Sequence, residues 1–282
     1  ASATIGSDHI DLEFCRRRGI GVATSIGCNA RGVLQWMAAS LALFEERFGL
    51  SPARTTLGVV GVGHVGRLVR EYALSWGFRV LCSDPPRERA EGLDAGEGFL
   101  PLTELVPQVD ILTLHTPLTR SGDDATFHLV DRDLLASLKP GAVLVDAARG
   151  EIVEPEALAE AVVSGRCRAA IDTWNDEPSI DRRVLARAAV ATPHIAGYSA
   201  QGKAMGTAMA VQAVATRFGL PLADWFPSDP TLRSHPAAIS WKEMKRTIRS
   251  RFDIEAETRL LQRHPERFEE RRNAYPYRQE YF

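Results

Sequence analysis

The sequence has little of what would mark a metal centre, a disulfide framework or a membrane segment. Its four cysteines, Cys15, Cys28, Cys82 and Cys167, do not stand at metal-ligand spacing, and free thiols in a reducing compartment are expected. No apolar run is long enough to span a membrane, and no signal peptide is recognisable. We therefore expect a cytoplasmic protein that holds no metal and binds no membrane.

Charge of one sign is not in excess, and lysine is scarce. The 34 basic and 36 acidic residues leave a net charge of −2, and only four of the basic residues are lysines. A balanced charge implies no attraction to nucleic acid. The hydrophobic fraction of 45% and the charged fraction of 25% are those of a globular protein, and 282 residues allow two domains.

The most informative stretch follows Thr56. An apolar, β-branched run leads into Gly61-Val62-Gly63-His64-Val65-Gly66, and a helical pattern then extends to Gly77. A second strand is expected at 78–82, and Asp84 stands just after it. A Gly-x-Gly-x-x-Gly motif alone is often only a glycine-rich turn. The order of strand, turn, helix, strand and acid, however, predicts a βαβ unit that binds a dinucleotide.

Each part of this motif has a physical role in that prediction. Gly61 allows the tight turn, Gly63 lets a pyrophosphate approach the backbone, and Gly66 lets the helix pack closely on the strand. The free N–H groups at the start of the helix, at His64 and Val65, would hold the phosphates. Asp84 would bind the ribose hydroxyls, which favours NAD over NADP.

Strand and helix patterns alternate through most of the chain, which predicts an α/β fold with a doubly wound parallel sheet. Further strands are expected at 109–115, 142–147, 168–172 and 190–192. Apolar residues at helical spacing predict helices at 29–48, 131–138, 155–163, 199–218 and 240–261. Near the start of the chain, a short helix that ends at Gly19 and a short strand at 20–23 are expected.

Polar residues follow the expected strands directly. In a parallel sheet these positions lie along one edge, where the ligands of doubly wound proteins bind. Five strand ends supply Asp84, Thr116, Arg149, Asp172 and His194. We therefore expect one crevice that holds both the dinucleotide and the groups that act on a substrate.

Three side chains of this crevice could carry chemistry. Arg149, before Gly150, is either a solvated turn residue or a guanidinium fork for a carboxylate. His194 is either a core histidine or the group that moves a hydroxyl proton during hydride transfer. Glu177 is either a solvated acid or the partner that orients the far nitrogen of His194. The sequence alone leaves these alternatives open.

Four segments, in this order, resemble the signatures of the D-isomer-specific 2-hydroxyacid dehydrogenases. They are the glycine motif at 61–66, Ala148-Arg149-Gly150, Asp172-Thr173-Trp174-Asn175-Asp176-Glu177-Pro178 and Thr192-Pro193-His194-Ile195-Ala196-Gly197. Shorter features resemble one branch of that superfamily, the 4-phosphoerythronate dehydrogenases of pyridoxal phosphate biosynthesis. These are Gly27-Cys28-Asn29-Ala30, Asp84-Pro85-Pro86-Arg87, His115-Thr116-Pro117-Leu118-Thr119, and Gly197-Tyr198 with Gly202-Lys203. The chain departs from that branch at Met205, where its members usually have arginine.

The resemblance implies a NAD-dependent oxidation of the C2 hydroxyl of 4-phosphoerythronate. Arg149, Glu177 and His194 would be the catalytic arginine, acid and histidine. Asp172 would lie near the nicotinamide amide. The residues that would line the cofactor are Thr116, Ala147, Ala148 and Gly197, and those that would face the substrate are Ser2, Arg149 and Tyr198.

The resemblance also implies a division into domains. Residues 1–28 would be a remnant of a flavodoxin-like substrate domain and 29–198 the NAD-binding domain, while 199–220 would return to the substrate domain and 221–282 would form a dimerisation region. The helix at 29–48 is of the kind with which this superfamily pairs subunits, so a homodimer is expected. Full members begin with a longer substrate domain, so we expect further residues before Ala1.

Two other functions are compatible with the same pattern. One is a dehydrogenase for phosphoglycerate or hydroxypyruvate. The other is a non-catalytic NAD sensor or corepressor built on the same fold. The presence of Arg149, Glu177 and His194 argues against the sensor.

Overall fold

The computed structural model describes residues 1–7, 9–91, 98–233 and 238–282. Its centre is a parallel sheet of six strands in the order β2-β1-β3-β4-β5-β6. The strands are β1 (Thr56–Val60), β2 (Arg79–Ser83), β3 (Ile111–Leu114), β4 (Val143–Asp146), β5 (Arg168–Ile171) and β6 (Val190–Ala191). The strand order reverses between β1 and β3, which is where a doubly wound sheet binds its ligands. The predicted fold class is confirmed.

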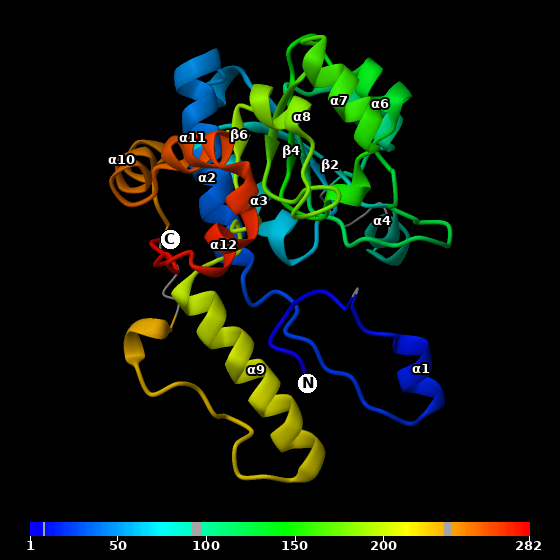
Figure 1. The fold of residues 1–282 in the computed structure, drawn as a ribbon, viewed down its shortest axis with the longest axis vertical. Helices are drawn as coiled ribbons and strands as arrows, with labels where there is room; N and C mark the ends of the chain where they lie inside the picture. Colours follow the sequence, from blue (N-terminus) through cyan, green and yellow to red (C-terminus); the bar gives the residue numbers. More distant parts are fainter. Residues whose placement is uncertain (8, 92–97, 234–237) are drawn as a thin grey trace.

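Helices cover both faces of this sheet and make two apolar cores (Figure 1). One face carries α2 (Ala30–Phe48), α3 (His64–Trp76) and α10 (Trp241–Arg251). The other carries α5 (Leu102–Leu105), α6 (Arg132–Ser137), α7 (Pro155–Val163) and α8 (Arg182–Arg187). The four central strands β1, β3, β4 and β5 are almost wholly buried between them, as strands of a covered parallel sheet must be.

The remaining helices lie at the edges of the sheet or outside it. They are α1 (Leu12–Arg17), α4 (Pro85–Glu91), α9 (Ala200–Phe218), α11 (Ile254–Arg263) and α12 (Phe268–Asn273). Short 3-10 turns stand at Pro52–Arg54, Val106–Gln108, Gly150–Ile152, Pro230–Leu232 and Pro265–Arg267. No helix among the described residues is both long enough and apolar enough to cross a membrane.

Two expectations about local structure are wrong. The segment 20–23 forms no strand; the only pairing described there is a single bridge between Ser2 and Thr24. The helix expected at 240–261 is two helices, α10 and α11. Phe252 leaves the helical conformation at φ −144°, and the side chain of Asp253 accepts the N–H of Ala256, so it begins a new helix.

Helix α2 is buried in the hydrophobic core of its own chain. Fourteen of its 19 residues are buried, because α3 and α10 pack against α2 in the core on one face of the sheet. Trp36 and Phe44 are completely inaccessible to solvent. A subunit interface would therefore have to use a different surface.

Helix α9 extends away from the sheet, and the N-terminal segment 1–28 runs beside it (Figure 1). The hydroxyl of Ser25 donates to the carbonyl oxygen of Gly206 at 2.8 Å. A Cβ on Gly206 would come within 3.0 Å of the carbonyl oxygen of Ala3, so the glycine lets the two segments touch. By contrast, the C-terminal residues 238–282 pack on the nucleotide-binding core, where Phe282 is 1% exposed.

Candidate active site

The glycine motif forms a tight turn between β1 and α3. Gly61 adopts φ +82°, and a Cβ there would come within 3.0 Å of Thr116 and of the backbone of His115. A Cβ on Gly66 would collide with the carbonyl oxygen of Gly61, so only glycine allows α3 to pack this closely. Gly63 is exposed and faces open space, which leaves its backbone accessible to a ligand.

The acid after β2 lies against this turn. One carboxylate oxygen of Asp84 accepts the N–H of Val62 at 2.7 Å, and the other accepts the N–H of Arg87 at 3.1 Å. Asp84 is therefore held at the rim of the glycine turn, as the dinucleotide prediction requires.

The two arginines that follow Asp84, Arg87 and Arg89, are both paired with acidic side chains. Arg87 makes two 2.6 Å hydrogen bonds to the carboxylate of Glu91 and donates to the carbonyl oxygen of Val62 at 2.9 Å. Arg89 pairs with Asp124. The positive charge of both is neutralised locally, which favours a ribose with free hydroxyls.

The described residues fit a dinucleotide. A cavity of about 520 Å³ adjoins the glycine turn, and Gly63, His64, Arg31 and Arg67 are among the residues that line it. The start of α3 and these basic side chains suit the negative charge of a pyrophosphate. The hydroxyl of Thr116, beside Gly61, is buried and has no hydrogen-bond partner among the residues that the structure describes, as expected for a group that a ligand satisfies.

Glu177 and His194 are in direct contact. The Nδ1 atom of His194 lies 2.9 Å from Oε2 and 3.1 Å from Oε1 of Glu177. Glu177 also accepts the N–H of Trp174 at 2.8 Å. Burial alone would raise the pKa of Glu177, but the hydrogen bond and charge of His194, with the N–H of Trp174 and the charge of Arg272, lower it. Glu177 is thus an ionised partner for the ring, and Nε2 of His194 is the nitrogen left to meet a substrate.

The backbone around His194 is fixed by a buried acid. His194 itself adopts φ +57°, a conformation that non-glycine residues reach mainly where the surroundings impose it. Asp172, 1% exposed, accepts the N–H of Ile195 and of Ala196 at 2.8 Å each and the hydroxyl of Thr192 at 2.5 Å. Burial raises the pKa of Asp172. The side chain predicted to lie near the nicotinamide amide therefore also holds the histidine loop in place.

Arg149 is brought to the same edge of the sheet by close backbone packing. A Cβ on Gly150 would collide with the backbone of Trp174 and Asn175, so the turn after β4 rests directly on the segment that carries Glu177. Nη1 of Arg149 donates to the carbonyl oxygen of its neighbour Ala148 at 2.7 Å. The Arg149 turn, the Glu177 segment and the His194 loop therefore follow the adjacent strands β4, β5 and β6.

Asp146, at the end of β4, is a buried acid that sequence reasoning did not single out. Its carboxylate accepts the N–H of Ala148 at 2.9 Å and the hydroxyl of Thr173 at 3.1 Å. Burial raises its pKa to about 7. Asp146 thereby links the predicted cofactor-lining residues Ala147 and Ala148 to the segment after β5.

Two of the predicted substrate residues, Tyr198 and Ser2, have different neighbours in the structure. Tyr198 has ring neighbours in Tyr275 at 6.3 Å and Tyr277 at 5.8 Å between centroids, and Lys203 lies over its face. Ser2 bonds to Thr4 and to the backbone of Ala23, within the N-terminal segment.

Gly197 lies at the start of α2. A Cβ on Gly32 would come within 3.0 Å of the backbone of Gly197, and a Cβ on Gly197 would collide with the side chain of Asn29. The residue predicted to line the cofactor is thus held between the histidine loop and α2.

Two arginines of the C-terminal tail reach the site, and sequence reasoning missed both. Nη1 of Arg272, on α12, lies 3.5 Å from Oε2 of Glu177. Arg278, 8% exposed, donates to the carbonyl oxygens of Ile195 and Ala196. The tail is rich in arginine, glutamate and tyrosine, a composition equally typical of a solvated segment, so the sequence carries no signal that separates these two side chains from the rest.

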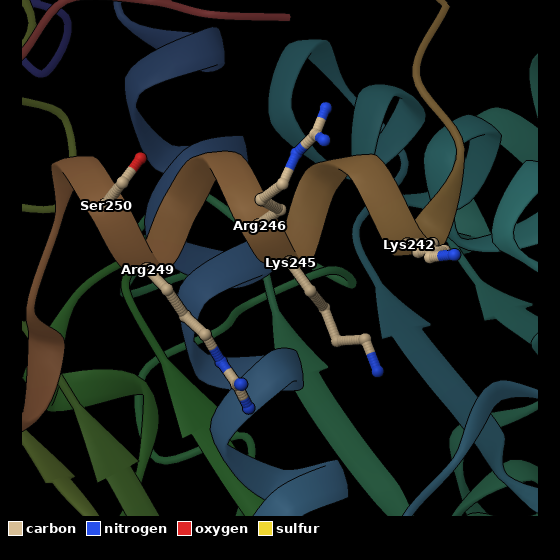
Figure 2. A pocket seen from close by; sticks show the side chains of 5 residues that line it. All are labelled: Lys242, Lys245, Arg246, Arg249 and Ser250. Atoms are coloured by element: carbon tan, nitrogen blue, oxygen red, sulfur yellow. The ribbon is translucent and has the colours of Figure 1, made fainter.

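A cluster of basic side chains on α10 makes ion pairs with α2. Lys242, Lys245, Arg246 and Arg249 line a shallow pocket along α10 (Figure 2). Lys245 pairs with Glu45, and Arg249 pairs with Glu46, both on α2. These ion pairs join α10 to the core helix and lie outside the glycine turn and the histidine loop.

Comparison with known proteins agrees with this geometry. The family model of the D-isomer specific 2-hydroxyacid dehydrogenase NAD binding domain matches residues 33–196. The NAD-dependent formate dehydrogenase from Staphylococcus aureus, solved in complex with NAD, superposes with a TM-score of 0.62 at 28% identity over 77% of this chain and 70% of that one. The D-lactate dehydrogenase from Aquifex aeolicus, solved with NAD and lactic acid, gives 0.63 at 26% identity over 81% and 79%. Fold and site therefore define a NAD-dependent 2-hydroxyacid dehydrogenase.

Curated relatives narrow this class. The erythronate-4-phosphate dehydrogenase of Bacteroides thetaiotaomicron is 38% identical over 99% of this chain and 79% of its own length. That of Porphyromonas gingivalis is 40% identical over 99% of this chain and 76% of its own length. The chain belongs to the erythronate-4-phosphate dehydrogenase family.

Proposed function

We propose that this protein oxidises the C2 hydroxyl of 4-phosphoerythronate to 2-oxo-3-hydroxy-4-phosphobutanoate, with NAD as the acceptor. The observation that carries the reaction is the 2.9 Å contact between Glu177 and His194, next to the turn that holds Arg149. The relatives that match almost the whole chain support the choice of substrate.

The oxidation separates a proton from the hydroxyl and an electron pair from the carbon. Arg149 binds the substrate carboxylate and polarises the C2 oxygen with its guanidinium fork. His194 accepts the hydroxyl proton at Nε2, and Glu177 holds the Nδ1–H and stabilises the charged ring that results. NAD, when bound, takes up the hydrogen that leaves C2 with its electron pair.

The supporting residues divide between the two ligands. We assign Asp172 to the nicotinamide amide, and Thr116, Ala147, Ala148 and Gly197 to the walls around the cofactor. We assign Ser2, in the N-terminal segment beside α9, and Tyr198 to the substrate. In this arrangement residues 1–28 belong to the substrate domain, 29–198 to the NAD-binding domain, and 199–220 return to the substrate domain.

We further propose that the protein forms a homodimer in the cytoplasm. Helix α9 and the turn after it expose large apolar side chains, among them Phe218 at 70% exposure. Exposed apolar patches are typical of interaction surfaces. The described structure has all four cysteines as free thiols, as is usual in a reducing compartment.

The test is NADH production from a panel of 2-hydroxy acids. The panel holds 4-phosphoerythronate, 3-phosphoglycerate, glycerate and lactate, with His194→Ala as the matched control. We expect the highest kcat/KM for 4-phosphoerythronate and little turnover by the variant. Preference for 3-phosphoglycerate or glycerate would assign a different dehydrogenase. NAD binding without turnover of any acid would favour a NAD sensor.

A further inference from the structure

Arg272 contacts the catalytic acid from a distant part of the chain. Its Nη1 lies 3.5 Å from Oε2 of Glu177, the same oxygen that lies 2.9 Å from Nδ1 of His194. The side chain of Glu177 is 18% exposed and that of Arg272 is 36% exposed, so solvent screens this charge pair only in part. Glu177 thus has three partners, namely the N–H of Trp174, the ring of His194 and this guanidinium.

Helix α12, which carries Arg272, is anchored independently of that contact. Phe268 at its start is 1% exposed. The 3-10 turn Pro265–Arg267, which precedes it, packs against both α11 and α12. Helix α11 in turn bonds to the strand before the histidine loop, because the N–H of Ala191 donates to the hydroxyl of Thr258. The position of Arg272 is therefore set by the same framework that sets His194.

We propose that Arg272 is a positioning residue of the dehydrogenase, which holds Glu177 against His194 and limits how strongly that carboxylate retains a proton on the ring. The inference rests on the proposed function, since it assigns Arg272 a part in the same proton transfer. The oxidation begins with a neutral His194, and a carboxylate with only one cationic partner would favour the charged ring. A second positive charge on Glu177 offsets this effect.

Other ionisable groups lie on the elements next to the pair, and the replacement of Arg272 leaves their side chains in place. Asp172 lies beneath the histidine loop, at the end of β5. Arg278 and Tyr275 approach from the C-terminal tail and bond to each other. Arg149 follows the neighbouring strand β4. A change in titration after replacement of Arg272 therefore reports on the loss of its own charge.

The test compares Arg272→Gln and Arg272→Lys with the control Arg271→Gln. The control removes the neighbouring guanidinium on the same helix and breaks the ion pair with Glu257 instead. For each protein, kcat, KM and the pH profile of kcat/KM are measured with 4-phosphoerythronate, together with Tm. We expect Arg272→Gln to lower kcat roughly fivefold, which corresponds to the energy of one moderate ion pair. We also expect the acidic limb of its kcat/KM profile to move to higher pH by roughly half a unit.

The controls distinguish a positioning role from a structural one. Arg272→Lys should recover most of kcat, because it restores the positive charge. For the same reason, the acidic limb of its kcat/KM profile should return to the wild-type pH. Arg271→Gln should lower Tm at least as much as Arg272→Gln but leave kcat and the pH profile unchanged. Wild-type kcat and pH profile in Arg272→Gln would overturn the proposal. An equal loss of kcat in Arg271→Gln would overturn it too, since disruption of α12 would then be the cause.

A readout that needs no turnover separates this proposal from the proposed function. The ring signal of His194 is followed by NMR across pH and is assigned by its absence in His194→Ala. Its titration midpoint should lie higher in Arg272→Gln than in the wild type or in Arg271→Gln. An inactive wild type with this shift would refute the proposed function alone, whereas an active wild type without it would refute the role of Arg272.

Discussion

Arg278 donates from Nη2 to the carbonyl oxygen of Ala196 at 2.6 Å, two residues after His194. The backbone of the same arginine bonds to both sides of the loop end, since its N–H donates to Tyr198 and its carbonyl accepts the N–H of Ala200. Arg278, near the end of the chain, therefore holds the loop that carries His194. In this family member, the C-terminal tail is part of the framework of the active site.

Removal of the histidine ring should separate catalysis from cofactor binding. His194→Ala should lower kcat by on the order of a hundredfold or more, because the ring is the group that we assign to accept the hydroxyl proton. The Kd for NAD, measured by calorimetry, should stay nearly the same. Near wild-type kcat in this variant would rule out the proposed mechanism.

Replacement of the catalytic arginine by lysine should act mainly on the substrate. A lysine retains the charge but cannot form the two parallel hydrogen bonds of a guanidinium to a carboxylate. Arg149→Lys should therefore raise the KM for 4-phosphoerythronate roughly tenfold or more, while the KM for NAD changes little. Arg183→Lys, at an exposed arginine of α8, is the matched control and should have wild-type constants. A wild-type substrate KM in Arg149→Lys would remove Arg149 from the carboxylate site.

Asp84, at the glycine turn, should make the protein bind NAD more tightly than NADP. Asp84 would accept the ribose hydroxyls and repel a 2′-phosphate. Asp84→Asn, which keeps the side chain's shape and loses its charge, should narrow the gap between the Kd for NAD and the Kd for NADP. Calorimetry on the wild type provides the reference. Equal or tighter binding of NADP by the wild type would contradict this assignment.

The buried acid at the end of β4 should make stability depend on pH. Burial raises the pKa of Asp146 from 3.8 to about 7, so in this range the folded chain holds a proton that the unfolded chain releases. The stabilisation is fully present below pH 4 and is lost as the pH rises to 7.

A neutral isostere provides the comparison for this effect. Between pH 4 and 7 the free energy of unfolding should fall in the wild type relative to Asp146→Asn, by on the order of 4 kcal/mol at most. Urea unfolding at several pH values measures it, and Asp133→Asn, at an exposed acid of α6, should show no such trend. A parallel pH dependence in the wild type and Asp146→Asn would contradict the burial argument.

The proposed dimer should be visible in solution. Light scattering at micromolar concentration should give twice the chain mass of 31.0 kDa. Phe218→Ser, at the exposed end of α9, should shift the mass toward the monomer if α9 contributes to the interface, and Phe127→Ser, at another exposed aromatic, is the matched control. A mass of 31.0 kDa for the wild type would overturn the dimer.

The nucleotide-binding unit could be predicted because its determinants are local. Glycines that need a positive φ or a missing Cβ stand at fixed spacing in the turn, and apolar periodicity marks the strand and the helix around it. The parallel sheet follows from alternating elements, and it brings their carboxyl ends to one edge without further information. Asp84, Arg149 and His194 could therefore be placed at one edge of the sheet, but the distances between them could not be predicted.

Other features depend on contacts between distant residues. The segment at 20–23 has strand-like residues, yet among the described residues the pairing beside it is limited to the single bridge between Ser2 and Thr24, which is too short to form a strand ladder. The helix pattern at 240–261 is broken because Asp253 caps a second helix that packs on β6. The first case lacks the strand partner that local propensity requires, and in the second a new cap and tertiary packing override that propensity.

The sequence by itself determined the fold class and the cofactor-binding turn, and it supplied the residue types of the proposed catalytic set, because backbone sterics and hydrophobic periodicity act within a few residues. Only the tertiary structure decided that Glu177 reaches Nδ1 of His194, that Asp172 lies buried beneath the histidine loop, and that Arg272 and Arg278 arrive from the tail. These contacts join residues 17 to 95 positions apart. Such pairings depend on how whole helices pack on the sheet, and no local pattern of residues encodes that.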